Sequence, residues 1–182
     1  MGNPFASSTG DLAHSQSTEQ HRHEAPKSVR CAVLTISDTR TPDDDRSGEI
    51  IKQQLVWRGH ELAAYSIVKD DPEAIAATIR EWAARDDIRA IISNGGTGIA
   101  RRDTTYDVVS RLLDKELTGF GELFRMLSYP EIGAAAMLSR AIAGVIDRTA
   151  IFCMPGSSNA VKLGMEKLVA PELAHVVYEM TK

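Results

Sequence analysis

The sequence predicts a single α/β domain in three layers, with a doubly wound, mostly parallel sheet covered by helices on both faces. Short apolar, β-branched runs alternate with segments that carry apolar residues at helical spacing, a pattern typical of right-handed βαβ units. The length of 182 residues and the hydrophobic fraction of 43% suit one compact domain with a packed core. In such a sheet, the ligand crevice lies at the carboxyl ends of the strands.

In the first part of the folded region, the sequence pattern predicts three strands and a helix. The strands are expected at residues 29–36, 61–68 and 88–93, which are apolar runs bounded by polar residues. A helix is expected over residues 47–58, because Gly59 can end it in a left-handed cap.

A second helix is expected directly after the second strand. Asp71 supplies an N-cap, and Pro72 fits the first helical position because its φ is already helical. Ile75, Ile79 and Trp82 follow at i, i+4 and i+7, so they should form the buried face.

The remaining elements are predicted from weaker patterns. A helix is expected over residues 105–114, two or three short helices over 119–146, and a buried strand over 150–154. Residues 159–168 and 172–180 are expected to form two closing helices, broken near Pro171 because proline cannot continue the first one.

Residues 1–28 are polar and have almost nothing to bury, so we expect a flexible N-terminal tail before the folded domain at residues 29–182. His21 and His23 invite a metal site, but such a pair in a tail is more often solvated, and we set it aside.

Charge and cysteine content exclude several functional classes. A net charge of -4 gives no reason to expect a nucleic acid or an anionic membrane as the main partner. Cys31 and Cys153 lie in apolar runs without metal-ligand or redox spacing, so we expect inert core thiols. The sequence contains no apolar stretch long enough for a membrane span and no signal-peptide core, so we expect a cytoplasmic protein.

Three polar loops each follow a predicted strand and should converge at the ligand-binding edge of the sheet. They are residues 37–40 (SDTR), 94–103 (NGGTGIARRD) and 155–158 (PGSS). The candidate substrate-binding residues in them are Ser37, Asp38, Gly95, Gly96, Thr97, Gly98, Pro155, Gly156 and Ser157.

The second loop can cradle an oxyanion. Gly95, Gly96 and Gly98 permit positive φ and let backbone N–H groups approach an anion without a Cβ in the way. The following helix adds its positive end. The glycines can equally form a purely structural turn, and Ser157 can belong to a proline-led turn into a helix.

Two aspartates are the candidate catalytic residues and metal ligands. A carboxylate at Asp103, beside a phosphate site, would be repulsive unless Mg²⁺ or an arginine intervened. Asp70 ends the second strand, and its neighbour Asp71 already provides the helix cap. Two such carboxylates can hold Mg²⁺ while it bridges phosphate oxygens. Alternatively, Asp103 simply caps the next helix.

Glu122, Ser139 and Arg140 are three further candidates, and two of them have a structural alternative. Glu122 lies at a helix start, where it can bind substrate or only complement the helix dipole. Arg140, beside Ser139, can pair with a phosphate or with a surface carboxylate.

Together these segments resemble the MoaB/Mog family of molybdenum cofactor biosynthesis proteins over about residues 29–175. The resemblance rests on five motifs in order: TISDTR, SNGGTGIARRDTT, GFGELFRMLS, LSRAIAG and MPGSS. The third motif, with EIG and PELAH further along, is closer to the MoaB branch than to Mog.

The resemblance implies the molybdopterin-binding fold, with the pterin and its phosphate held by the GGTG and PGS loops. Asp70 and Asp103 match the family's two functional aspartates. The implied reaction is adenylylation of molybdopterin, with Mg²⁺ as cofactor and ATP as co-substrate, although GTP stays open as the nucleotide. The implied partners are other molybdenum cofactor assembly proteins and further copies of the chain, in a homotrimer or hexamer.

Three alternatives remain. The chain could be a non-catalytic molybdopterin carrier or scaffold, or a nucleotide-processing enzyme like the N-terminal part of CinA-like proteins, although those are longer. A dinucleotide-binding protein is disfavoured, because no GxGxxG follows the first strand. The sequence does not distinguish molybdenum from tungsten.

Overall fold

The computed structural model describes residues 21–182, which fold around a six-stranded sheet. The strands are β1 (Arg30–Ile36), β2 (Glu61–Val68), β3 (Ala90–Asn94), β4 (Lys115–Glu116), β5 (Ile142–Ile146) and β6 (Thr149–Met154). Their order across the sheet is β2-β1-β3-β6-β5-β4. β2, β1, β3 and β6 are parallel, whereas β5 and β4 add an antiparallel edge. The expected mostly parallel sheet is confirmed.

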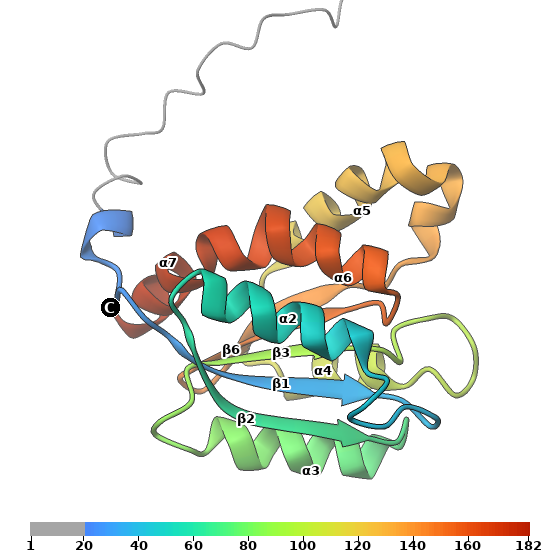
Figure 1. Ribbon diagram of the computed structural model, residues 1–182, viewed down its shortest axis with the longest axis horizontal. Coiled ribbons are helices and arrows are strands. Elements are labelled where there is room, and N and C mark those ends of the chain that lie inside the picture. The colour runs from blue at the N-terminus through green and yellow to red at the C-terminus, as the bar shows by residue number, and fades with distance from the viewer. Residues whose placement is uncertain (1–20) are drawn as a thin grey trace, which may run out of the picture.

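Helices cover both faces of this sheet, which is the middle of three layers (Figure 1). They are α2 (Arg46–Trp57), α3 (Pro72–Ala83), α4 (Thr105–Leu112), α5 (Thr118–Ile132), α6 (Ser158–Gly164) and α7 (Ala170–Thr181). α2, α5, α6 and α7 share one apolar cluster, which includes Leu55, Phe124 and Leu173. α3 and α4 pack on the other face through Ile79 and Val109. The predicted doubly wound fold is confirmed.

The caps that the sequence predicts delimit α2 and α3. The Asp71 carboxylate accepts a hydrogen bond from Ala74 N (2.9 Å) and so caps α3. Ile75 and Ile79 on the inner face are 0% exposed. Gly59 has a φ of 82° just beyond α2, a left-handed conformation that favours glycine.

The connections place a crevice between β1 and β3. The crossover from β1 to β2 carries α2 on one face of the sheet, whereas the crossover from β2 to β3 carries α3 on the other (Figure 1). Because β1 lies between β2 and β3, the loops that follow β1 and β3 lead to opposite faces of the sheet, one to α2 and the other to α4. This is the topological switch point at which open α/β sheets bind ligands.

Residues 119–146 do not form the expected two or three short helices. α5 is one helix of 15 residues that contains Pro130, and a 3-10 helix (Gly133–Leu138) follows it. Ile142–Ile146 is a strand, because a turn through Asp147 (φ 51°) pairs it antiparallel with β6. The spacing of apolar residues in a five-residue run fits a strand and a buried helix equally well. Pairing with a neighbouring strand therefore determines that this run is a strand.

The expected break near Pro171 is also wrong. The chain stays helical from α6 through a π-helical turn (Met165–Val169) into α7. Pro171 lies in the first turn of α7. Its missing N–H removes one regular i→i−4 bond, and the wider π turn lies directly before that position.

The expected tail is partly described. Residues 21–24 form one helical turn, so this portion of the 1–28 segment is ordered against α7, where His21 Nδ1 lies 2.8 Å from Glu179 Oε1. Residues 1–20 lie outside the described residues, and their flexibility stays a prediction.

Two other expectations concern the environment of the chain. Cys31 and Cys153 are free and buried, which confirms that both are core thiols, and burial raises the pKa of each to about 12. Within residues 21–182, no helix combines the length and the apolar character that crossing a bilayer requires.

Candidate functional site

The three polar loops meet at the carboxyl ends of β1, β3 and β6, as expected. The carbonyl oxygen of Gly156 accepts hydrogen bonds from Arg40 Nη2 (3.1 Å) and Ser47 Oγ (2.9 Å). Gly156 also lies so close to the second loop that a Cβ on it would be 3.1 Å from Gly95 Cα. Hydrogen bonding therefore joins the first loop to the third, and close packing joins the third to the second.

A cavity of about 410 Å³ lies between these loops and α5, and we call it the glycine-loop cavity. Nine of the predicted site residues line it: Gly95, Gly96, Thr97, Gly98, Asp103, Ser139, Pro155, Gly156 and Ser157. The sequence reasoning missed its opposite wall, which consists of Phe124, Ser128, Ile132 and Leu138 from α5 and the 3-10 helix. The cavity thus has a backbone-rich polar wall facing a largely apolar one.

A second cavity of about 500 Å³ lies at the ends of β1 and β2. Ser37 and Asp38 line it together with Arg40, Tyr65 and Lys69. The predicted residues of the first loop therefore border this cavity and not the glycine-loop cavity.

Two glycines in the loop after β3 adopt conformations that other residues rarely take. Gly95 has a φ of 100° and Gly96 a φ of 62°. A Cβ on Gly96 would lie 2.2 Å from Thr105 Oγ1 and 2.6 Å from Asp70 Oδ2. Gly98 does not have a positive φ, but a Cβ there would lie 2.6 Å from Asp103 Oδ2. These close approaches leave room only for backbone.

Asp70 lies against this loop, as its position after β2 suggested. Its Oδ1 accepts hydrogen bonds from Thr104 N (3.1 Å) and Thr104 Oγ1 (2.8 Å), which anchors the start of α4. Its backbone N donates to Asp38 Oδ1 (3.2 Å) in the first loop. Its Oδ2 faces Gly96 and accepts no hydrogen bond among the described residues.

Asp103 does not cap the following helix, because the N-cap of α4 is Thr104. Instead, Asp103 Oδ2 accepts a hydrogen bond from Ala100 N (2.9 Å) and closes a turn within the loop. Asp70 lies against Gly96 and Asp103 against Gly98, so both carboxylates flank the same short stretch of backbone. Asp70 Oδ2 and Asp103 Oδ1 accept no hydrogen bond among the described residues, and carboxylate oxygens are the ligands that a hard cation such as Mg²⁺ prefers.

Three buried polar atoms at this end of the sheet have no hydrogen-bond partner among the described residues: Asn94 Oδ1, Thr105 Oγ1 and Ser139 Oγ. Ser139 lines the glycine-loop cavity, and Thr105 lies beside Gly96. Buried polar atoms in folded proteins are nearly always hydrogen bonded. A polar ligand in the glycine-loop cavity would supply a partner for Ser139 Oγ.

Arg140 donates hydrogen bonds to the loop that follows β3. Its Nε donates to the carbonyl oxygen of Gly98 (2.9 Å), and its Nη2 donates to the carbonyl oxygens of Gly98 (2.6 Å) and Asp103 (2.8 Å). Its Nη1 forms a salt bridge with Asp107 (3.1 Å). Of the two interpretations of Arg140, the structure therefore shows the pairing with a surface carboxylate.

Two other candidates have structural surroundings of their own. Ser157 is the N-cap of α6, because its Oγ accepts from Ala160 N (3.3 Å), and it also lines the glycine-loop cavity. Glu122 lies on an exposed part of α5 and lines neither cavity, so the structure does not bring it together with the other candidates.

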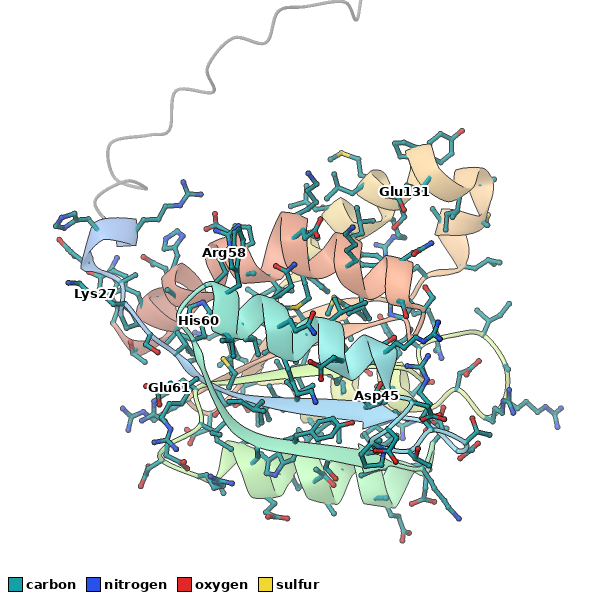
Figure 2. All side chains as sticks on the ribbon, viewed as in Figure 1. Lys27, Asp45, Arg58, His60, Glu61 and Glu131 are labelled. Atoms are coloured by element: carbon teal, nitrogen blue, oxygen red, sulfur yellow. The ribbon has the colours of Figure 1, made fainter. Side chains whose placement is uncertain are left out.

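The sequence reasoning also missed a buried network around Asp45, the N-cap of α2 (Figure 2). Its side chain is 1% exposed and accepts from Thr35 Oγ1 (2.6 Å), Tyr65 OH (2.8 Å) and Gly48 N (2.9 Å). Burial alone would raise the pKa of Asp45, but these hydrogen bonds outweigh it and lower that pKa. Burial and the bond to Asp45 raise the pKa of Tyr65. The only signal in the sequence was an aspartate directly before a helix.

Comparison with known proteins places the chain in a family. Residues 32–175 match the family model described as "Probable molybdopterin binding domain". The chain is 59% identical to molybdenum cofactor biosynthesis protein B of Halalkalibacterium halodurans over 167 residues, which cover 91% of this chain and 98% of the relative.

Solved structures give the same result. A crystal structure of a molybdenum cofactor biosynthesis protein B has a TM-score of 0.83 and 53% identity, covering 86% of this chain and 98% of the other. The tungsten cofactor synthesizing protein MoaB from Pyrococcus furiosus has a TM-score of 0.78 and 38% identity, covering 87% of this chain and 100% of the other. The chain therefore belongs to the molybdopterin-binding domain family, with the MoaB and Mog proteins of molybdenum cofactor biosynthesis.

Proposed function

We propose that this protein binds molybdopterin in the glycine-loop cavity and adenylylates it with ATP. The observation that carries the proposal is the position of Asp70 and Asp103, which flank Gly96 and Gly98 at the edge of that cavity. The cavity of about 410 Å³ has a size typical of small-molecule sites. The membership of the family and the names of the relatives support the pterin as ligand.

The backbone of the glycine loop would bind the terminal phosphate of the pterin. Gly95 N already donates to Met154 O (3.0 Å), so this N–H is occupied. The N–H groups of Gly96, Thr97 and Gly98 form no hydrogen bond with the described residues and remain for the phosphate. The apolar wall around Phe124 would face the pterin body and exclude water.

In the proposed reaction, a phosphate oxygen of molybdopterin attacks the α-phosphorus of ATP. The bond from that phosphorus to the bridging oxygen breaks, and pyrophosphate leaves while adenylated molybdopterin forms. Asp70 and Asp103 would hold Mg²⁺, which would supply positive charge to offset the negative charge of the phosphates. Because both aspartates also anchor the loop, they would keep the two phosphates in line.

The test is incubation of the protein with molybdopterin, Mg²⁺ and either ATP or GTP, with detection of the nucleotidylated pterin. Asp70→Asn and Asp103→Asn should each abolish turnover, because the amide oxygen can still accept the loop hydrogen bonds while the negative charge is lost. Pterin binding, measured by titration calorimetry, should persist or tighten as repulsion falls. Asp71→Asn is the matched control, because asparagine caps α3 equally well and Asp71 lines neither of the two cavities.

A non-catalytic molybdopterin carrier, which hands the pterin to other cofactor assembly proteins, is the second candidate. It is favoured by one observation: Asp70 and Asp103 each have a structural role in holding the loop. If the wild-type protein gave no nucleotidylated product with any nucleotide, the carrier function would replace catalysis. The same holds if both aspartate variants lost pterin affinity as severely as a bulky replacement of Gly96.

A further inference from the structure

Three potential metal ligands from opposite ends of the chain meet beside α7: His21, His175 and Glu179. Glu179 Oε1 lies 2.8 Å from His21 Nδ1 and 3.7 Å from His175 Nε2. One ligand atom from each residue lies within 4.8 Å of the other two. In a tetrahedral zinc site with bonds of about 2.0–2.1 Å, ligand atoms are about 3.3 Å apart, so only small side-chain rotations separate this cluster from a bound ion.

Two of the ligands are placed by α7 alone. His175 and Glu179 are four residues apart, so they lie on the same face of the helix. The third ligand depends on the helical turn at residues 21–24, which a pairing of Arg22 with Glu172 holds against α7. The site therefore exists only when the N-terminal segment is docked.

Glu172 orients the central imidazole. Its Oε2 lies 3.0 Å from His175 Nδ1, so it can accept a hydrogen bond from a proton-bearing Nδ1 while Nε2 lies on the side of Glu179. A carboxylate on the outer nitrogen of a histidine is the usual support of a metal-binding imidazole.

Lys182 now provides the positive charge in this cluster. Its Nζ lies 3.0 Å from Glu179 Oε1 and 3.1 Å from His21 Nε2. Its side chain is 43% exposed, so it can move into solvent when another cation takes its place. The ammonium group contacts these ligands through hydrogen bonds, whereas a metal ion would accept a lone pair directly from each imidazole and from the carboxylate.

We propose that His21, His175 and Glu179 bind a divalent transition-metal ion, with Zn²⁺ as the representative ion, and that this ion fastens the N-terminal segment to α7. Two imidazoles and one carboxylate suit Zn²⁺ and its late first-row neighbours, whereas Mg²⁺ prefers oxygen ligands alone. The site lies near the C-terminus, at the end of the sheet opposite to the carboxyl ends of the parallel strands (Figure 1). It is thus distinct from the proposed pterin site.

The experiment is a titration of EDTA-treated, full-length protein with ZnCl₂ against a chromogenic chelator. We expect one tight site per chain, weakened at least ten-fold in His21→Ala, His175→Ala and Glu179→Gln, and roughly ten-fold in Glu172→Gln. His23→Ala is the matched control, since this histidine lies in the same turn but outside the cluster. Asp70→Asn should keep the site, which separates it from any metal at the glycine loop.

Lys182→Ala distinguishes a metal site from a simple network of ion pairs. A metal site should bind zinc equally or more tightly when the competing ammonium is removed, and zinc should raise the melting temperature. Without zinc, the same substitution should loosen the contact between residues 21–24 and α7. Weaker zinc binding in Lys182→Ala, no stoichiometric zinc binding, or equal affinity in all ligand variants would each overturn the proposal.

Discussion

At the scale of single residues, Asp45 joins the elements that carry the site. Its carboxylate accepts from Thr35 on β1, Tyr65 on β2 and Gly48 on α2, and Arg40 links it to the third loop through the carbonyl oxygen of Gly156. Asp45→Asn should lower the free energy of unfolding by about 2–4 kcal/mol, because a buried charged acceptor of several hydrogen bonds is replaced by a neutral one. Urea denaturation at pH 7 measures this loss.

The pH dependence of that loss follows from the lowered pKa of Asp45. A carboxylate whose pKa is lower in the folded than in the unfolded state stabilises the fold above the unfolded value of about 3.9. This contribution disappears as the pH falls through the folded pKa. The difference between wild type and Asp45→Asn should therefore be full at pH 7 and shrink below about pH 4. A difference that stayed constant down to pH 2 would contradict the assignment.

Gly96 provides a prediction about binding. Gly96→Ala would combine a left-handed φ with a Cβ only 2.2 Å from Thr105 Oγ1, so the glycine loop must shift. We expect pterin affinity to fall ten-fold or more, measured by calorimetry. Gly59→Ala is the matched control: its φ of 82° imposes similar strain, but its Cβ would meet nothing within 4 Å. It should cost about 1–2 kcal/mol of stability and leave binding unchanged. Equal binding losses in both variants would show that strain alone disturbs the loop.

At the scale of elements, Arg140 braces the segment between β3 and α4. Its guanidinium donates to the carbonyl oxygens of Gly98 and Asp103 from a position just before β5. Arg140→Lys keeps the charge but loses the planar fork, so amide exchange in residues 98–104 should accelerate. Exchange mass spectrometry measures this. Arg85→Lys, at a surface pair with Asp87, should leave exchange there unchanged.

How far the sequence predicts each element depends on where its determinants lie. β2 and α3 were predicted because an apolar run, the cap at Asp71 and the spacing of Ile75 and Ile79 are local signals. β5 was missed because its strand state depends on pairing with β6, and the helical continuity at Pro171 depends on a π turn.

The same distinction applies to the site. The sequence predicted which loops converge, because each follows a parallel strand. Other parts of the site arise only when distant segments pack together. They are the hydrogen bonds from Thr35 and Tyr65 to Asp45, and the apolar wall of the glycine-loop cavity that includes Phe124. They could not be read from local pattern. The alternatives for Arg140 were likewise decided by contacts across the fold, whereas those for Asp103 were decided by a local turn with Ala100.

At the scale of the whole molecule, α5 and the 3-10 helix after it carry apolar side chains with little cover in the single chain. Tyr129 is 63% exposed and Met137 76% exposed, and Met126, Ile132 and Leu138 are also exposed. An apolar patch of this kind marks an interaction surface. Ile132 and Leu138 also line the glycine-loop cavity, so a partner on this surface would border the proposed pterin site.

We expect a second and a third copy of this chain to cover that surface, giving a homotrimer or two trimers paired as a hexamer. Cyclic symmetry brings the same patch of each copy into contact with a neighbour and closes without leaving an exposed end. Light scattering at micromolar concentration should give three or six times the mass of 19.9 kDa.

Two substitutions test whether the α5 surface makes this assembly. Met137→Glu should dissociate the oligomer, because a carboxylate in an apolar interface loses its hydration without gaining a partner. The chain should still fold, since the side chain is exposed in the single chain. Trp57→Glu is the control, because Trp57 on α2 is 74% exposed and equally apolar but lies on another helix. If Trp57→Glu dissociated the oligomer and Met137→Glu did not, the assembly would form through α2. If the wild-type protein were a monomer at these concentrations, assembly through either surface would be contradicted. The rim of the apolar wall of the glycine-loop cavity would then face solvent.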